Sequence, residues 1–246
     1  MKKLILITFA SLIILNHSFS QVISKSKHKT FIDSSYQVDQ HINYDLKKEL
    51  DSISIADQKY REITFSSLQT KADSFAAVFK VPENELADYL IKTMQQTDSS
   101  NIKRVKEICS QYGYPGKSLV GTPTNEAAFY VIQHSLNIDE YLPLIKKAAD
   151  NGELSFRLYA MMLDRSLMYH GQEQMYGTQV KGFYTTNSQS GKREFVRIVW
   201  PIKNPAQVNE RRKQAGFDRT VEENANRLGT EYKVLTLEDV KKMQEK

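Results

Sequence analysis

The strongest candidates for chemistry lie at the ends of two apolar stretches of the sequence. His134 follows the apolar run 127–132, and Asp164 and Arg165 follow the apolar run 158–163. Helices that are apolar on every side belong inside a fold, and a buried charge is costly unless it is paired. We therefore predict that Asp164 orients an imidazole nitrogen of His134, the candidate general base, while Arg165 holds an anionic group of a ligand.

The same three residues also allow a structural interpretation. Asp164 would then bind a nearby backbone turn, Arg165 would pair with an acid, and His134 would be a neutral, hydrogen-bonded core residue. Since both interpretations give every buried polar group a partner, the sequence leaves both open.

A polar loop after the second apolar run would complete the site. Residues 170–179 contain three glutamines, a tyrosine and a threonine, which offer many neutral hydrogen-bonding groups and few groups for acid–base chemistry. Such a loop either holds a small polar or anionic ligand or braces the fold. The candidate ligand-binding residues are Arg165, Gln174, Tyr176, Thr178, Gln179 and Arg211, with His134 and Asp164 as catalytic candidates for hydrolysis. The alternative is a non-catalytic periplasmic binding or interaction module.

Other common chemistries lack their sequence patterns. His134, Asp164, His170 and Glu173 do not have the spacing of HExxH or a comparable metal-binding motif. The sequence contains no GxSxG turn, no phosphate-binding lysine loop and no GxGxxG after a strand. We predict neither a metal site nor a cofactor.

The first residues of the chain have the order of a secretory signal peptide. Lys2 and Lys3 precede an apolar stretch over 4–15, and the small residues Ser18 and Ser20 follow it. The apolar stretch is shorter than the about 20 residues of a membrane-spanning helix. We therefore predict cleavage after Ser20, export to the periplasm or the medium, and no stable membrane insertion afterwards.

The composition narrows the class of partner. The chain has 34 Lys and Arg against 29 Asp and Glu, and two of its lysines lie in the predicted signal peptide. Its basic residues form no long run and accompany no RNA-binding motif, so we predict no nucleic-acid partner. A single cysteine excludes a disulfide framework, and the helical spacing around Cys109 predicts a buried, unreactive thiol.

Periodicity and breaking residues predict a mainly α protein, a compact helical module with one small β-hairpin near its C-terminus and a helical N-terminal extension. The extension breaks near Pro82, and a new helix carrying Cys109 is expected after Ser99 and Asn101. Within the first helix, Asp57 lies on the apolar stripe, and we predict an intrahelical pair with Arg61. The predicted organisation is signal peptide 1–20, flexible leader 21–40, extension 41–96, module 97–230 with the hairpin at about 176–200, and charged C-terminal tail 231–246.

A series of short motifs runs along the chain in a fixed order. The series comprises Asp57-Gln58-x-x-Arg61, Tyr112-Gly113-Tyr114-Pro115, Gln133-His134, Asp164-Arg165, Gln174-Met175-Tyr176-Gly177-Thr178-Gln179 and Arg211-Arg212. It resembles an uncharacterised, often exported bacterial family, a domain of unknown function, over about residues 46–228. The resemblance implies no activity, but it implies that His134, Asp164-Arg165 and the segment 176–179 belong to one site or one structural brace.

Overall fold

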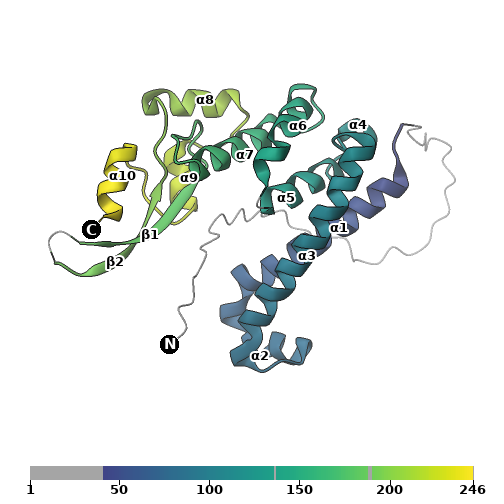
Figure 1. Ribbon diagram of the computed structural model, residues 1–246, viewed down its shortest axis with the longest axis horizontal. Helices are drawn as coiled ribbons and strands as arrows, with labels where there is room; N and C mark the ends of the chain where they lie inside the picture. The colour runs from purple at the N-terminus through teal and green to yellow at the C-terminus, as the bar shows by residue number, and fades with distance from the viewer. Residues whose placement is uncertain (1–40, 136, 188–189, 246) are drawn as a thin grey trace, which may run out of the picture.

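The computed structural model describes residues 41–135, 137–187 and 190–245, without the side chains of residues 66–70 (Figure 1). The predicted signal peptide and leader lie outside the described residues. The described chain is mainly helical with one two-stranded hairpin near its C-terminus, so the predicted fold class is confirmed.

The N-terminal helices form a long, antiparallel arm. Helix α1 (Tyr44–Glu62) runs into a π-helical turn (Ile63–Ser67) and α2 (Leu68–Phe79), and α3 (Glu83–Tyr112) returns along α1. The break expected at Pro82 is confirmed, since Pro82 directly precedes α3. The helix start expected after Ser99 and Asn101 is wrong because no glycine or proline interrupts residues 83–112.

The continuous course of α3 joins the arm to the rest of the protein. The predicted domain boundary between residues 96 and 97 falls inside this helix. Although α3 has 30 residues, neither it nor any other helix in the described part is apolar enough over sufficient length to cross a membrane.

A compact set of helices follows α3 and contains the main apolar core. These helices are α4 (Lys117–Val120), a 3-10 turn (Thr124–Glu126), α5 (Ala127–His134), α6 (Ile138–Asp150) and α7 (Phe156–Tyr169). Helix α5 packs against α1 and α3, while α6 packs against α7. The two apolar runs lie inside this core as predicted, since Phe129, Ile132 and Met162 have no exposed surface.

The cysteine lies at the edge of the same core. Cys109 is half-buried and packs against the main apolar cluster. Burial raises the pKa of its thiol to about 11, which keeps the thiolate scarce at neutral pH.

The hairpin and three short helices form the C-terminal end of the molecule (Figure 1). Strands β1 (Val180–Thr186) and β2 (Arg193–Val199) are antiparallel, with Val180 opposite Val199. A 3-10 turn (Pro205–Gln207) follows the hairpin. The three short helices after it are α8 (Val208–Gln214), α9 (Val221–Arg227) and α10 (Leu237–Gln244). The predicted C-terminal tail thus contains α10, whose buried Val240 shares a cluster with Ile198 and Trp200 of the hairpin segment.

Candidate functional site

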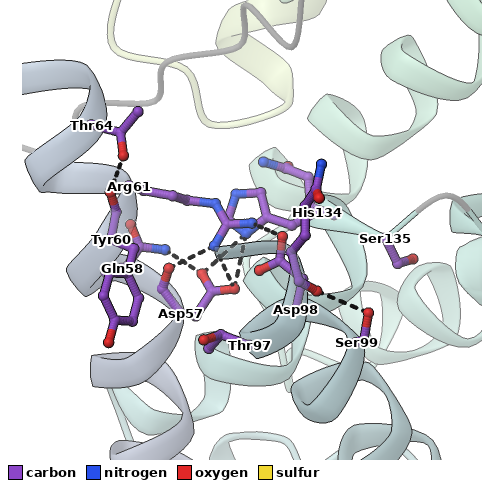
Figure 2. A network of polar contacts seen from close by, with 12 residues as sticks. Asp57, Gln58, Tyr60, Arg61, Thr64, Thr97, Asp98, Ser99, His134 and Ser135 are labelled. Carbon is purple, nitrogen blue, oxygen red and sulfur yellow. Dashed lines mark hydrogen bonds and ion pairs between the residues drawn. The ribbon is translucent and has the colours of Figure 1, made fainter. Parts of the chain in front are cut away.

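His134 contacts a carboxylate on the first helix of the fold. Its Nδ1 lies 3.0 Å from Oδ2 and 3.2 Å from Oδ1 of Asp57, which is 77 residues earlier in the chain (Figure 2). Among the residues that the structure describes, no hydrogen bond or ion pair joins His134 to Asp164. The predicted contact between these two residues is therefore wrong, because the Asp164 carboxylate is occupied elsewhere.

Asp57 lies on the buried stripe of α1, and its carboxylate contacts three polar side chains there. Its carboxylate is 1% exposed and accepts hydrogen bonds from Gln58 Nε2 at 2.6 Å and Arg61 Nη1 at 3.1 Å, besides its contact with His134. The predicted pair between Asp57 and Arg61 is confirmed. These donors offset the cost of burying the carboxylate.

Arg61 links this group to helix α3. Its Nη2 donates to Oδ2 of Asp98 at 2.6 Å, so one guanidinium bridges two carboxylates, as Figure 2 shows. The other oxygen of Asp98, Oδ1, is buried and has no hydrogen-bond partner in the part of the chain that the structure describes. Burial raises the pKa of Asp98, and the hydrogen bond from Arg61 opposes this shift.

Arg165 approaches from α7 and contacts the end of α5. Its side chain is 4% exposed, and its Nη1 donates to the backbone carbonyl of Gln133 at 2.7 Å. Burial lowers the pKa of Arg165, and the charge of Arg61 acts in the same direction. No carboxylate in the described part of the chain lies within ion-pairing distance, so the acid partner expected under the structural interpretation is not found there.

We call this group of side chains the His134 cluster. It consists of Asp57, Arg61, Asp98, His134 and Arg165, contributed by α1, α3, α5 and α7. When neutral His134 donates its Nδ1 proton to Asp57, the lone pair lies on Nε2. Nε2 contacts no described residue by a hydrogen bond, and the imidazole is 18% exposed. The geometry therefore suits a general base held in one tautomer.

Asp164 holds the loop that follows α7. It has no exposed surface, and its two oxygens accept hydrogen bonds from the backbone amides of Met175, Tyr176 and Thr178 and from the Thr178 hydroxyl. The structural interpretation of Asp164 as a partner of a backbone turn is confirmed. Burial raises its pKa to about 6, and the hydrogen bonds from the loop oppose the shift.

Most of the other predicted ligand-binding residues lie within the same loop, and Arg211 contacts it from α8. Gln174 binds the backbone of Gln179 and Trp200 through 2.7–3.1 Å hydrogen bonds. Arg211 donates to the carbonyl oxygens of Met175, Lys203 and Asn204. The neighbouring Arg212 donates to the carbonyl oxygen of Tyr176 at 2.7 Å. We call this set the loop brace; its members are Asp164, Gln174, Tyr176, Thr178, Gln179, Arg211 and Arg212.

The predicted site thus divides into two. His134 and Arg165 belong to the His134 cluster, whereas Asp164 and the remaining predicted residues belong to the loop brace. The contact of His134 with Asp57 and the link through Arg61 to Asp98 were not predicted from the sequence. The charge at Asp57 on an apolar helical stripe was the signal that could have drawn attention to them.

Comparisons with known proteins give a family but no activity. No curated protein and no solved structure shows significant similarity to this chain. The sequence model of a family of unknown function, DUF6624, matches residues 44–235, which include all of the His134 cluster and the loop brace. The chain therefore belongs to the DUF6624 family.

Proposed function

We propose that the His134 cluster binds a small anionic molecule and hydrolyses it, with His134 as the general base. The observation that carries this proposal is the 3.0 Å contact between His134 Nδ1 and the buried carboxylate of Asp57. A carboxylate in this position holds the imidazole in one orientation and stabilises the imidazolium that forms during proton transfer. Arg165 supplies a positive charge one residue from the end of the His134 helix, through its bond to Gln133.

The proposed reaction needs only a water molecule besides the substrate. His134 Nε2 accepts a proton from water as the water oxygen attacks an acyl carbon or a phosphorus atom. The bond to the leaving group then breaks, and the imidazolium returns the proton to the leaving group. The positive charge of Arg165 would hold the anionic group of the substrate and, where that group is the reacting phosphate itself, stabilise its negative charge during the reaction.

The second candidate is a binding or interaction module without catalysis. It is favoured by the loop brace, in which the side chains of Asp164, Gln174 and Arg211 bind the protein's own backbone and so have a structural role. In this case the bond from Arg165 to the end of α5 would also be structural, since cations stabilise helix C-termini.

Substitution of His134 separates the two candidates. We expect the purified protein to hydrolyse members of a panel of small anionic esters, including p-nitrophenyl phosphate and mono-p-nitrophenyl succinate. His134→Gln should lower that rate at least about 100-fold, and Asp57→Asn should lower it too. His170→Gln is the matched control because His170 is 56% exposed at the end of α7. Turnover that survives His134→Gln in a folded variant, or is absent across the panel, would favour the non-catalytic module.

We also propose that the protein is exported after cleavage following Ser20. The support is the order of charged, apolar and small residues over positions 1–20. Expression in a bacterial host should give a mature chain that begins at Gln21 in the periplasm or the medium, as determined by N-terminal sequencing. An uncleaved chain retained in the cytoplasm would contradict this proposal.

A further inference from the structure

We infer that Arg165 binds the anionic group of the ligand through one edge of its guanidinium, and that this group is a carboxylate or a phosphate. The inference rests on the proposed ligand site and assigns its substrate class. It is carried by the hydrogen-bonding pattern of Arg165 in the described structure.

One side of the Arg165 guanidinium is hydrogen-bonded, and another side has no partner among the described residues. Nη1 donates to the carbonyl of Gln133 at 2.7 Å, whereas Nε is buried and has no hydrogen-bond partner. No described residue accepts a hydrogen bond from Nη2. The N–H groups of Nε and Nη2 point in the same direction along one edge of a guanidinium, and this spacing matches the two oxygens of a carboxylate or phosphate.

The free edge is unusual for a buried arginine. Buried polar groups are nearly always hydrogen-bonded, and an unpaired buried donor calls for an explanation. Packing alone does not supply one, since a donor that stays unpaired destabilises the fold. An oxyanion would satisfy both Nε and Nη2 at once, and it would also supply the negative charge that Arg165 lacks among the described residues.

The neighbouring charges favour an anion at this position. Burial is the main cause that lowers the pKa of Arg165; Tyr169 opposes this shift, and the positive charge of the nearby Arg61 adds to it, so two guanidinium groups contribute to the local positive potential. Arg61 is already bonded to Asp57 and Asp98, which leaves Arg165 as the cation of the cluster with a free edge. The carboxylates of Asp57 and Asp98 pair with Arg61, and that of Asp57 also contacts His134, so neither neutralises Arg165 by direct contact.

The inferred position also suits the proposed reaction. Arg165 contacts Gln133, the residue before His134, so an anion on its free edge would lie near the imidazole. Because Arg165 is 4% exposed, we expect its side chain to adjust when the anion enters, as side chains commonly do at binding sites with a fixed backbone.

NMR of the arginine Nε–H groups tests the inference in the whole protein. The probes are inorganic phosphate and, in a separate titration, succinate. We expect at least one of them to shift the Arg165 Nε–H signal in a saturable manner, and the more effective probe distinguishes a phosphate from a carboxylate ligand. Arg165→Lys, which keeps the charge but lacks the two-donor edge, should bind that probe at least about tenfold more weakly.

The control is Arg157→Met, since Arg157 lies on α7 and is only partly buried. This variant should bind the probe as the unmodified protein does. An Arg165 signal that neither anion moves, or equal affinity in a folded Arg165→Lys variant, would overturn the inference. If Arg165→Lys does not fold, the NMR titration of the unmodified protein still shows whether either anion binds at Arg165.

The outcomes also separate this inference from the proposed hydrolysis. Saturable anion binding at Arg165 without His134-dependent turnover would support the inference and contradict the hydrolase. His134-dependent turnover that is unchanged in Arg165→Lys would support the hydrolase and contradict the inference.

Discussion

The side chains of His134 and Asp57 join two helices that lie far apart in the sequence. The imidazole at the C-terminal end of α5 meets a carboxylate in the second half of α1, at 3.0 Å from Nδ1 to Oδ2. Arg61 extends the contact to Asp98 on α3. The polar network therefore fixes the position of the helical arm relative to the core and holds the candidate base at their junction.

Removal of the Asp57 carboxylate should destabilise the protein strongly. Asp57→Ala leaves His134 without its partner and takes one of the two carboxylates from Arg61 in a buried environment. Loss of one member of a buried ion pair typically costs 3–5 kcal/mol, and we expect the free energy of unfolding to fall by about 3 kcal/mol. Urea denaturation followed by circular dichroism measures this change.

Asp45→Ala provides the control, because Asp45 lies on the same helix but is exposed in its first turn. Its effect should stay below about 1 kcal/mol. An equal fall in the free energy of unfolding in the two variants would show that the contacts of Asp57 stabilise the protein no more than an exposed carboxylate does.

Asp164 should make the stability of the protein depend on pH. Burial raises its pKa in the folded state to about 6, from the ordinary value of 3.8 for an aspartate. Since the folded state then binds this proton more tightly than the unfolded state, the contribution of Asp164 is greatest below about pH 4 and is lost as the pH rises through about 6. The rise of the pKa from 3.8 to about 6 corresponds to roughly 3 kcal/mol.

The comparison with Asp164→Asn isolates this contribution. The difference in unfolding free energy between the unmodified protein and the variant should shrink between pH 4.5 and 7.5, measured by urea denaturation at several pH values. A difference that is constant over this range, or grows with pH, would contradict the prediction.

The loop brace predicts that Arg211 acts on stability rather than on ligand binding. Arg211→Ala removes hydrogen bonds to three backbone carbonyls. Since two of these bonds are solvent-exposed, we expect a loss of about 1–2 kcal/mol, with phosphate and succinate affinity unchanged. Arg193→Ala on the exposed end of β2 should have little effect on either quantity. A loss of anion affinity in folded Arg211→Ala would restore Arg211 to the ligand site.

Local sequence signals were enough to predict most of the helices. The apolar spacing around Leu46 and Leu50 predicts α1, and Pro82 marks the start of α3, because both signals act over a few residues. The helix start that was expected near Ser99 is absent for a reason that is also local and concerns the side chain of Ser99. Its hydroxyl donates to the carbonyl of Gln95 within the helix, so a residue typical of helix starts lies in the interior.

The composition of the site could not be predicted to the same extent. His134 and Asp164 each come just after an apolar run of the sequence, and this shared position suggested that they meet. The choice between Asp57 and Asp164 as the partner of His134 depends on how α1 packs against α5, and no short-range pattern encodes that packing. Asp164 is instead satisfied by amides only 11 to 14 residues later in the chain, a more local solution to the same burial cost.

The C-terminal helix should protect the single tryptophan of the chain. Val240 of α10 is 2% exposed and shares an apolar cluster with Trp200, and the Thr185 hydroxyl of β1 donates to the carbonyl of Met243. Val240→Asp would place an unpaired charge in this cluster, so we expect α10 to detach and Trp200 fluorescence to shift to the red. Because one valine contributes about 1.5–3 kcal/mol when buried, the hairpin end should also unfold at lower urea. Glu238→Gln, an exposed change on the same helix, should leave the emission unchanged. An unshifted spectrum for Val240→Asp would mean that α10 does not cover Trp200.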